Sequence, residues 1–202
     1  MAGDTGGSEF QEQVETVHFE TGAELEKWLE TNGDSEDELW IEIYKKHTGV
    51  PSLTWAEIVD AALCFGWIDS QSRRIDDDRY RQRLTPRRAR SKWSKVNRVK
   101  VEALIDTGRM REPGLAEVER AKADGRWEAA YDGQATAEVP DDLAKAMKSA
   151  KVEAQFAKLD SQSRYSILHR LMTLKTEAAR ERNIIKFCET LEQKSRDGTP
   201  AT

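Results

Sequence analysis

The sequence predicts an α+β protein: a mixed α/β N-terminal part, with a small antiparallel sheet and an arginine-rich hairpin, followed by a helical C-terminal part. Segments with the two-residue alternation of strands lie within residues 14–84, whereas helical periodicity continues to residue 193. Six tryptophans, with Leu, Ile and Val around them, indicate a packed core. The 202 residues suffice for one large domain or for a domain with an appended module.

The first elements are expected close to the N-terminus. Residues 14–19 alternate polar and apolar side chains as a strand does. Thr21 and Glu24 have the spacing of a capping box, which opens an amphipathic helix, and Asn32 followed by glycine ends it. Residues 38–45 alternate again, so a second strand is expected there.

A second helix is expected after a turn at residues 49–52. Thr54 and Glu57 form another capping box, and the apolar positions of residues 55–65 cover nearly the whole circumference of the helix. A helix that is apolar on all sides is buried. The tryptophans expected in the core are Trp40, Trp55 and Trp67.

A β-hairpin is expected next in the chain. After Gly66, two extended runs at residues 67–75 and 79–84 flank three aspartates at 76–78. Aspartates suit a tight connection because their side chains bond the backbone of the turn. Charged or polar residues alternate with apolar ones, so arginines should occupy one or both faces of the hairpin.

The rest of the chain is expected to be helical. Ser94 is placed to cap one helix and Pro140 to start another. Both ends of the chain contain Gly, Ser, Thr and charges without periodicity, and we expect them to be mobile. The expected helices run over residues 94–108, 112–123, from 140 onward, 163–174 and 175–193. The expected organisation is a disordered tail at 1–9, the α/β part at 10–132, the helical part at 133–193 and a disordered tail at 194–202.

The charge distribution is the most informative functional feature. Between residues 71 and 100, twelve Lys or Arg oppose three Asp, a local charge of +9 in a chain whose formal total is −5. Arginine suits planar, bidentate capture of phosphate or carboxylate, and it stacks on aromatic rings. We therefore expect an anionic ligand or a protein partner to bind here. The candidate binding residues are Arg73, Arg74, Arg81, Arg83, Arg87, Arg88, Trp93 and Asn97.

Structural explanations compete with binding. Acidic surroundings can pair with these arginines inside the fold, and charged strands commonly prevent edge-to-edge aggregation. Trp93 can equally serve as a hydrophobic staple at the start of a helix. The acidic total argues against generic coating of nucleic acid, although a local basic groove within residues 73–100 leaves nucleic acid open.

Catalytic and metal chemistry has weaker support. No glycine-rich phosphate loop follows a strand, and no His or Cys accompanies the aspartates at 76–78, so no cofactor or metal is expected. Cys64 and Cys188 lie in apolar helical patterns typical of buried, reduced thiols. One catalytic alternative remains, with Asp69 as acid or base beside an arginine clamp on a small anionic substrate.

The sequence shows no sign of membrane insertion or export. No segment approaches the ~20 apolar residues that span a bilayer. The N-terminus lacks the apolar core of a signal peptide. We therefore expect a cytoplasmic protein.

Several motifs carry a resemblance to a known family. They are Gly66-Trp67-Ile68-Asp69-Ser70-Gln71, Leu84-Thr85-Pro86-Arg87-Arg88 with Ser91-Lys92-Trp93-Ser94-Lys95-Val96-Asn97, Gly108-Arg109-Met110 with Gly114-Leu115, and Gly125-Arg126-Trp127 with Ala130-Tyr131-Asp132. Through them the chain resembles the YdeI/OmpD-associated (bacteriocin-protection) family over about residues 19–191. Residues 163–187 resemble its C-terminal OmdA domain. Ser70 departs from the family pattern, which more often has Gly before the Gln.

The resemblance implies a bacterial stress protein linked to tolerance of bacteriocins or cationic antimicrobial peptides. It implies no reaction and no catalytic residues. Two hypotheses therefore stand: a non-enzymatic binding protein with an anion-binding Arg/Trp surface, or an enzyme acting on a small anionic substrate. An enzyme would place Asp69 in a pocket beside the arginines. Direct contact with cationic peptides would instead use the acidic segments at 9–30 or 34–38.

Overall fold

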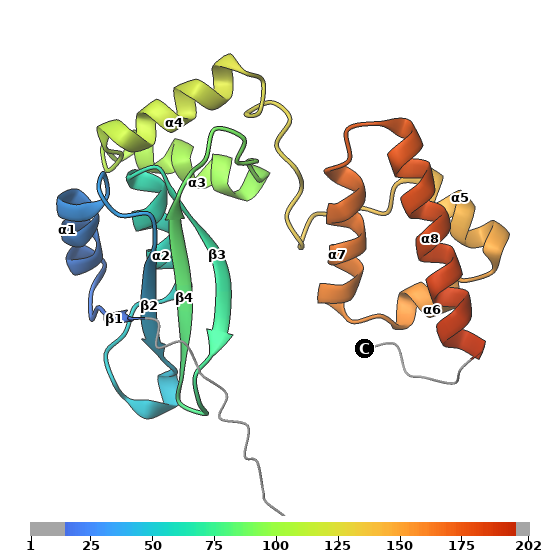
Figure 1. Ribbon diagram of the computed structural model, residues 1–202, viewed down its shortest axis with the longest axis horizontal. Helices are drawn as coiled ribbons and strands as arrows, with labels where there is room; N and C mark the ends of the chain where they lie inside the picture. The colour runs from blue at the N-terminus through green and yellow to red at the C-terminus, as the bar shows by residue number, and fades with distance from the viewer. Residues whose placement is uncertain (1–14, 197–202) are drawn as a thin grey trace, which may run out of the picture. The chain divides into compact units, whose positions relative to one another are not determined.

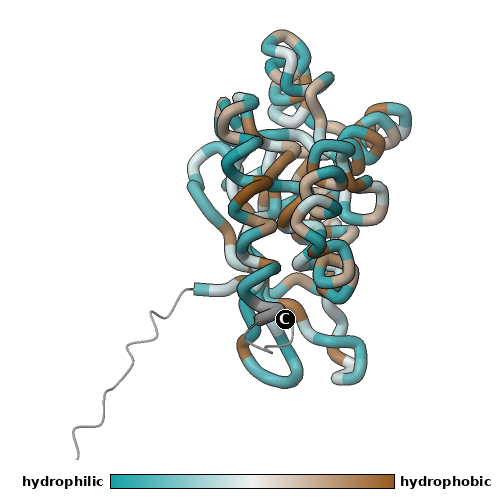
Figure 2. The backbone as a smooth tube through the Cα atoms, turned by 90° about the vertical axis from the view of Figure 1, so that its right-hand side faces the viewer, coloured by the Kyte–Doolittle hydropathy of each residue, from teal (hydrophilic) through white to brown (hydrophobic). Residues whose placement is uncertain are grey.

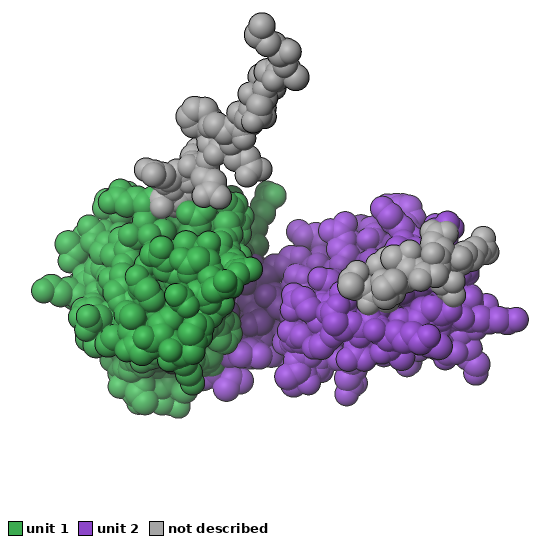
Figure 3. All heavy atoms as spheres, turned by 90° about the horizontal axis from the view of Figure 1, so that it is seen from below, with its two compact units in different colours: residues 1–91, 100–121 green, residues 92–99, 122–202 purple. Residues whose placement is uncertain are grey.

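The computed structural model describes the backbone of residues 15–196 and the side chains of residues 15–193 (Figure 1). The tail expected at residues 1–9 lies outside the described residues. The chain divides into two compact units, coloured separately in Figure 3. We call residues 1–91 and 100–121 the sheet unit, and residues 92–99 and 122–202 the helical unit.

The α+β class is confirmed, because one mixed sheet precedes an all-helical part (Figure 1). The sheet has the strand order β1-β2-β4-β3. Strand β1 pairs with β2 in parallel, and the other neighbours are antiparallel. The strand expected over residues 14–19 is assigned only at two residues. The strands are β1 (Val17–His18), β2 (Leu39–Tyr44), β3 (Trp67–Arg74) and β4 (Arg79–Pro86).

The predicted hairpin is confirmed as the antiparallel pair β3 and β4, joined at residues 75–78. A bulge lies between Asp69 and Ser72, beyond which Arg73 pairs with Arg81. The bulge adds a residue to β3 and so changes which side chains face each side of the sheet. As a result, arginines from both strands of the hairpin reach the same face.

The helices α1 (Gly22–Asn32) and α2 (Trp55–Cys64) form the hydrophobic core of the sheet unit with one face of the sheet. From β2, Leu39, Ile41 and Ile43 point into this core and are buried. Trp67 of β3 is buried as well, and its ring meets that of Trp28 edge to face at 6.1 Å. Such a layer is the usual way to cover one apolar face of an antiparallel sheet.

The start of α2 shows both a confirmed and a wrong prediction. The capping box is present, since the Thr54 hydroxyl accepts from the Glu57 N–H and the Glu57 carboxylate accepts from the Thr54 N–H. Trp55, however, is 49% exposed and does not lie in the core. It occupies the first helical position, where its indole N–H donates to Asp69 at 3.1 Å.

The sheet unit is completed by η1 (Lys46–Thr48), most of α3 (Lys95–Asp106) and α4 (Glu112–Ala123). Helix α4 approaches the C-terminal end of α2 so closely that a Cβ on Gly114 would lie 2.3 Å from the Cys64 carbonyl oxygen. Gly66, just after α2, has a φ of 75°, a conformation that glycine adopts without strain. Both glycines therefore serve the packing of α2.

The helical unit has its own core, formed by four helices around buried residues such as Leu143, Leu171 and Cys188. The last helix continues to residue 196, beyond the expected start of the C-terminal tail at 194. Residues 197–202 lie outside the described part of the chain. The four helices are α5 (Asp141–Ala150), α6 (Glu153–Lys158), α7 (Ser161–Met172) and α8 (Glu177–Arg196).

Two segments that the sequence grouped with the α/β part pack in the helical unit. They are residues 92–99 and 122–132. The Trp93 and Trp127 rings meet at 4.9 Å, the Tyr131 N–H donates to the Trp93 carbonyl at 3.0 Å, and Lys95 pairs with Asp132 at 2.8 Å. Aromatic packing and backbone bonds therefore join these segments.

Figure 2 shows that hydrophilic and hydrophobic residues alternate along the helices in short runs. Among residues 15–196, no helix is long and apolar enough to cross a membrane.

Candidate anion-binding site

The face of the sheet opposite α2 carries four arginines. Directly paired residues of neighbouring strands project to the same side. Because Trp40 pairs with Arg83 and Glu42 pairs with Arg81, these four side chains share one face. The pairing of Arg73 with Arg81 adds a residue from β3. We call this surface the arginine face; its members are Trp40, Glu42, Arg73, Arg79, Arg81 and Arg83.

Trp40 lies at the centre of the arginine face beneath two guanidinium groups. The Arg81 Cζ lies 4.9 Å from the Trp40 ring centroid, and the Arg73 Cζ lies 5.4 Å from it. These distances fit cation–π contacts. Trp40 is only 6% exposed, although it points away from the helices. The two arginines therefore cover an aromatic ring and gather two positive charges over it.

Neighbouring arginines on the same face are neutralised. Arg79 pairs with Glu42 at 3.0 Å and with Asp76 at 2.7 Å, and Arg83 pairs with Glu38 at 2.5 Å. Burial tends to raise the pKa of Glu42, but hydrogen bonds from Tyr44 and Arg79 outweigh it, so this pKa lies below its ordinary value. The Arg79 hydrogen bond likewise lowers the pKa of Asp76.

Arg73 and Arg81 differ from these neighbours. Within residues 15–193, no carboxylate lies within ion-pairing distance of either guanidinium, and Arg73 donates only to the Gln71 side chain, at 3.1 Å. The Arg81 Nε is buried without a hydrogen-bond partner among the described residues. A buried donor without a partner costs roughly 1–3 kcal/mol, and more when it is charged. This pair is therefore suited to accept an anion.

Other predicted binding residues lie elsewhere. Arg74 pairs with Asp77 at the hairpin tip, and Arg88 is exposed beyond the end of β4. Asn97 lies on α3 in the helical unit, where its N–H donates to the Ser94 hydroxyl at 3.1 Å. Arg74, Arg88 and Asn97 are therefore not members of the arginine face.

The sequence predicted Arg87 and Trp93 as ligand-binding residues at the surface. The structure instead buries both side chains. Arg87 is 5% exposed, and its N–H donates to the Gly66 carbonyl at 2.9 Å. Trp93 is 2% exposed and packs against Trp127. Neither side chain is presented to a ligand in solvent. Trp93 instead packs against a second tryptophan, Trp127.

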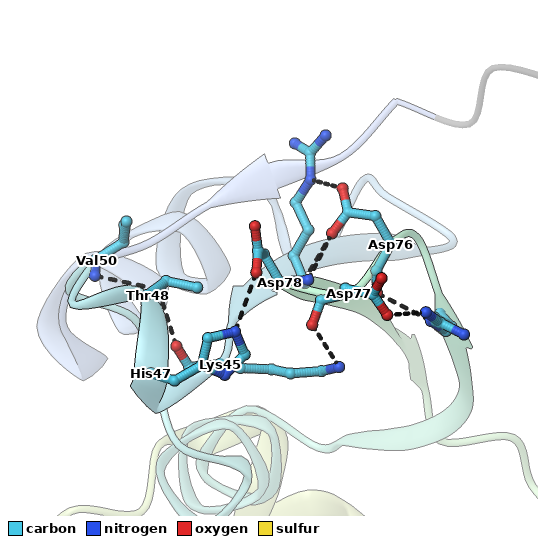
Figure 4. A network of polar contacts seen from close by, with 9 residues as sticks. Lys45, His47, Thr48, Val50, Asp76, Asp77 and Asp78 are labelled. Carbon is cyan, nitrogen blue, oxygen red and sulfur yellow. Dashed lines mark hydrogen bonds and ion pairs between the residues drawn. The ribbon is translucent and has the colours of Figure 1, made fainter.

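The three aspartates at the hairpin tip have structural partners (Figure 4). The Asp76 carboxylate accepts the backbone N–H groups of Asp78 and Arg79, each at 2.9 Å. Lys45 donates to the Asp77 carbonyl at 2.7 Å, and His47 lies 3.0 Å from Asp78. Within residues 15–193, no group of three or more His, Cys, Asp or Glu side chains is arranged to hold a metal ion.

The groups that the catalytic alternative requires, Asp69 and the arginine pair, lie on opposite faces of the sheet. Asp69 pairs with Leu84, which points toward the helices, whereas Arg81 points the other way. The arginine pair and Asp69 therefore do not form one site. Burial raises the pKa of the Cys64 thiol to about 11 and also raises that of Cys188, which disfavours the nucleophilic thiolate at either position.

Sequence reasoning placed Trp40 in the core and did not assign it to the site. Its burial is confirmed, but on this face the ring is covered by arginines. A usable signal is present in the chain: Trp40 and Glu42 alternate with Leu39, Ile41 and Ile43, which assigns them to the face opposite the core.

Comparison with known families finds two matches. Residues 136–194 match the family described as bacteriocin-protection, YdeI or OmpD-associated (OmdA). Residues 17–117 match a domain of unknown function, DUF8412. No curated protein and no solved structure matches the chain.

Proposed function

Because residues 136–194 match the bacteriocin-protection, YdeI or OmpD-associated (OmdA) family, we propose that this chain is a cytoplasmic, non-enzymatic binding protein that contributes to bacteriocin or cationic-peptide tolerance. Its arginine face binds an anionic ligand or an anionic region of a partner. The observation that carries this proposal is the pair formed by Arg73 and Arg81 over Trp40, without a carboxylate partner among the described residues.

The chemistry of the pair favours an anion with several oxygens. Two guanidinium groups on adjacent strands repel each other, and a bound phosphate, sulfate or carboxylate relieves this repulsion. The Trp40 ring supports both groups from below and so reduces the freedom that they would lose on binding. Arg79 and Arg83, already paired with carboxylates, frame the pair without competing for the ligand.

Binding is favoured over catalysis for a geometric reason. The carboxylate proposed as acid or base, Asp69, accepts a hydrogen bond from Trp55 on the helix side of the sheet. The arginine pair lies on the other side. Cationic peptides would be repelled by this pair, so we expect no direct contact between them and the arginine face.

A heparin column tests the proposal, with the salt concentration at elution as the readout. The Arg73→Gln/Arg81→Gln variant should elute at clearly lower salt, and its affinity should fall about tenfold or more, because charged hydrogen bonds contribute about 1.5–3 kcal/mol each. The matched control is Arg88→Gln/Arg90→Gln, which removes the same charge from exposed positions of the same basic segment. It should elute close to the wild type.

Two outcomes would overturn the proposal. Equal retention of the Arg73/Arg81 variant and the wild type would mean that the pair does not bind anions. Equal loss in both variants would show a general charge effect spread over the basic segment. Circular dichroism of each variant checks that the fold is retained.

A further inference from the structure

A cavity in the helical unit has no role in the proposed function. Its volume is about 270 Å³. One wall is a single face of α7, because Ser161, Arg164, Tyr165 and Leu168 follow the i, i+3, i+4, i+7 spacing. Phe156 of α6 also belongs to the lining.

The cavity has an apolar portion and a polar portion. Phe156 and Leu168 are 7% and 6% exposed and belong to the hydrophobic core of the helical unit, so the cavity reaches that core. In the polar portion, Gln134 donates to the Ser161 hydroxyl at 2.6 Å, and the Tyr165 hydroxyl donates to a backbone carbonyl at 3.1 Å. The lining is about half polar and half apolar, so it can contact both a charged group and an apolar group of one small molecule.

Arg164 is the charged residue of this lining. Within residues 15–193, its guanidinium has no carboxylate in ion-pairing distance and no hydrogen-bond acceptor. Two other arginines of the helical unit are engaged: Arg180 holds Asp142 with two bonds, at 2.5 and 3.0 Å, and Arg170 donates to Asn183 at 3.3 Å. The cavity thus combines an available planar donor with an apolar floor.

We propose that this cavity binds a small organic monocarboxylate with an apolar tail. Arg164 receives the carboxylate through its parallel N–H groups, which match the two carboxylate oxygens. The tail lies against Phe156, Leu168 and Val139, and its removal from water supplies most of the affinity. Hexanoate, a fatty acid whose alkyl tail is long enough to reach these apolar side chains, represents this class of ligand.

Charge and size both select this class. A single guanidinium neutralises one negative charge, and the carboxylate of Asp160 caps the same end of α7 by accepting from the Ser163 N–H and hydroxyl. A dianion such as phosphate would therefore meet repulsion without a second cation. The volume of about 270 Å³ lies close to the lower end of the range found for small-molecule sites, which favours a small ligand.

Titrations with hexanoate, hexanol and acetate test the proposal, with the backbone amide shifts of Tyr165 and Leu168 in NMR spectra as the readout. Hexanoate should give saturable shifts, whereas hexanol, which lacks the charge, and acetate, which lacks the tail, should bind at least about tenfold more weakly. Arg164→Gln should weaken hexanoate binding by a similar factor. Val139→Asn, at a partly exposed wall position, should weaken it less.

The matched control is Arg182→Gln, which removes an equal charge from an exposed position on α8 outside the lining. It should bind hexanoate as the wild type does. The proposal is overturned if hexanoate causes no saturable shifts, if hexanol binds equally well, or if Arg164→Gln binds unchanged.

The two proposals can be tested independently of each other. Arg164→Gln should keep the wild-type elution from heparin, and Arg73→Gln/Arg81→Gln should keep hexanoate binding. Loss of hexanoate binding in the sheet variant would show that the shifts do not report on the cavity, and would also overturn the inference.

Discussion

The hairpin of β3 and β4 has two charged regions that differ in whether their arginines are paired with carboxylates. At its tip, Arg74 and Arg79 pair with the carboxylates of Asp77 and Asp76, Lys45 donates to the Asp77 carbonyl, and His47 lies 3.0 Å from Asp78 (Figure 4). Farther along the same strands, Arg73 and Arg81 meet an aromatic ring and, among the described residues, no carboxylate. The tip stabilises the turn, whereas the arginine face keeps two positive charges available.

This difference shows that the density of charge in a sequence does not predict its availability. The stretch from 71 to 100 has a local charge of +9, yet Arg74, Arg79 and Arg83 are paired and Arg87 is buried. At Arg73 and Arg81, strand pairing brings two cations together without placing a carboxylate of the described residues beside them. The predictions below test that contrast, from the largest expected effect to the smallest.

The first prediction concerns the ring that supports the arginine pair. Trp40→Ala should destabilise the protein by about 3–5 kcal/mol, the usual cost of truncating a buried tryptophan, and should also abolish anion binding. Trp55→Ala is the matched control, because Trp55 is half exposed and would lose mainly one hydrogen bond, worth about 1 kcal/mol. Denaturant unfolding measures the loss of stability in both variants. Similar losses in the two variants would contradict a packing role specific to Trp40.

The second prediction compares two adjacent arginines of the basic segment. Arg87→Ala should destabilise by about 1.5–3 kcal/mol, because a buried guanidinium and its packed stem are removed. Arg88→Ala should change the free energy of unfolding by no more than about 0.5 kcal/mol, since its side chain is exposed. The same denaturant experiment decides: a neutral Arg87→Ala would mean that this side chain is free to serve a ligand.

Local chemistry predicted much of the fold. The Thr54 capping box, the aspartate turn and the helix after Ser94 were all identified, because each depends on residues a few positions apart. The last helix was expected to end at 193 and continues to 196, since its boundary has no strong signal. Trp55 was wrongly predicted to lie in the core. The apolar residues of α2 surround the helix, but this pattern does not reveal which turns are packed, and Trp55 in the first turn is exposed.

The candidate site depended on long-range pairing. Trp40 and Arg81 are about 40 positions apart, and only the register between β2 and β4 brings their side chains together. The bulge in β3 then decides that Arg73 joins them. Long-range packing also removes candidates from the site. Trp93 and Arg87 were predicted as binding residues, and tertiary packing buries them. Sequence reasoning selected the segment that contains the candidate pair, but it could not separate the paired and buried arginines of that segment from Arg73 and Arg81.

The third prediction is a pH dependence on the paired side of the arginine face. The folded-state pKa of Glu42 lies below its ordinary value of 4.5, so the carboxylate stabilises the fold above that range and loses this contribution as the pH falls through it. Glu42→Gln should lower stability at pH 7 by about 1 kcal/mol, and the difference from the wild type should shrink below about pH 4. Urea unfolding across this range measures it. A constant difference between the two proteins would contradict the ion pair with Arg79.

The smallest effect is expected at the hairpin tip. The side chains of His47 and Asp78 are 62% and 65% exposed, although they lie 3.0 Å apart. Exposed ion pairs contribute about 0–1 kcal/mol, because solvent screens the charges and ordering two mobile side chains costs entropy. Asp78→Asn keeps the size of the side chain and should change the free energy of unfolding by less than about 0.5 kcal/mol, with anion binding unchanged. Its effect should vanish at high salt, since screening removes what remains of the attraction. A loss of more than about 2 kcal/mol, or weaker heparin retention, would mean that the tip and the arginine face act as one unit, and the contrast between them would fail.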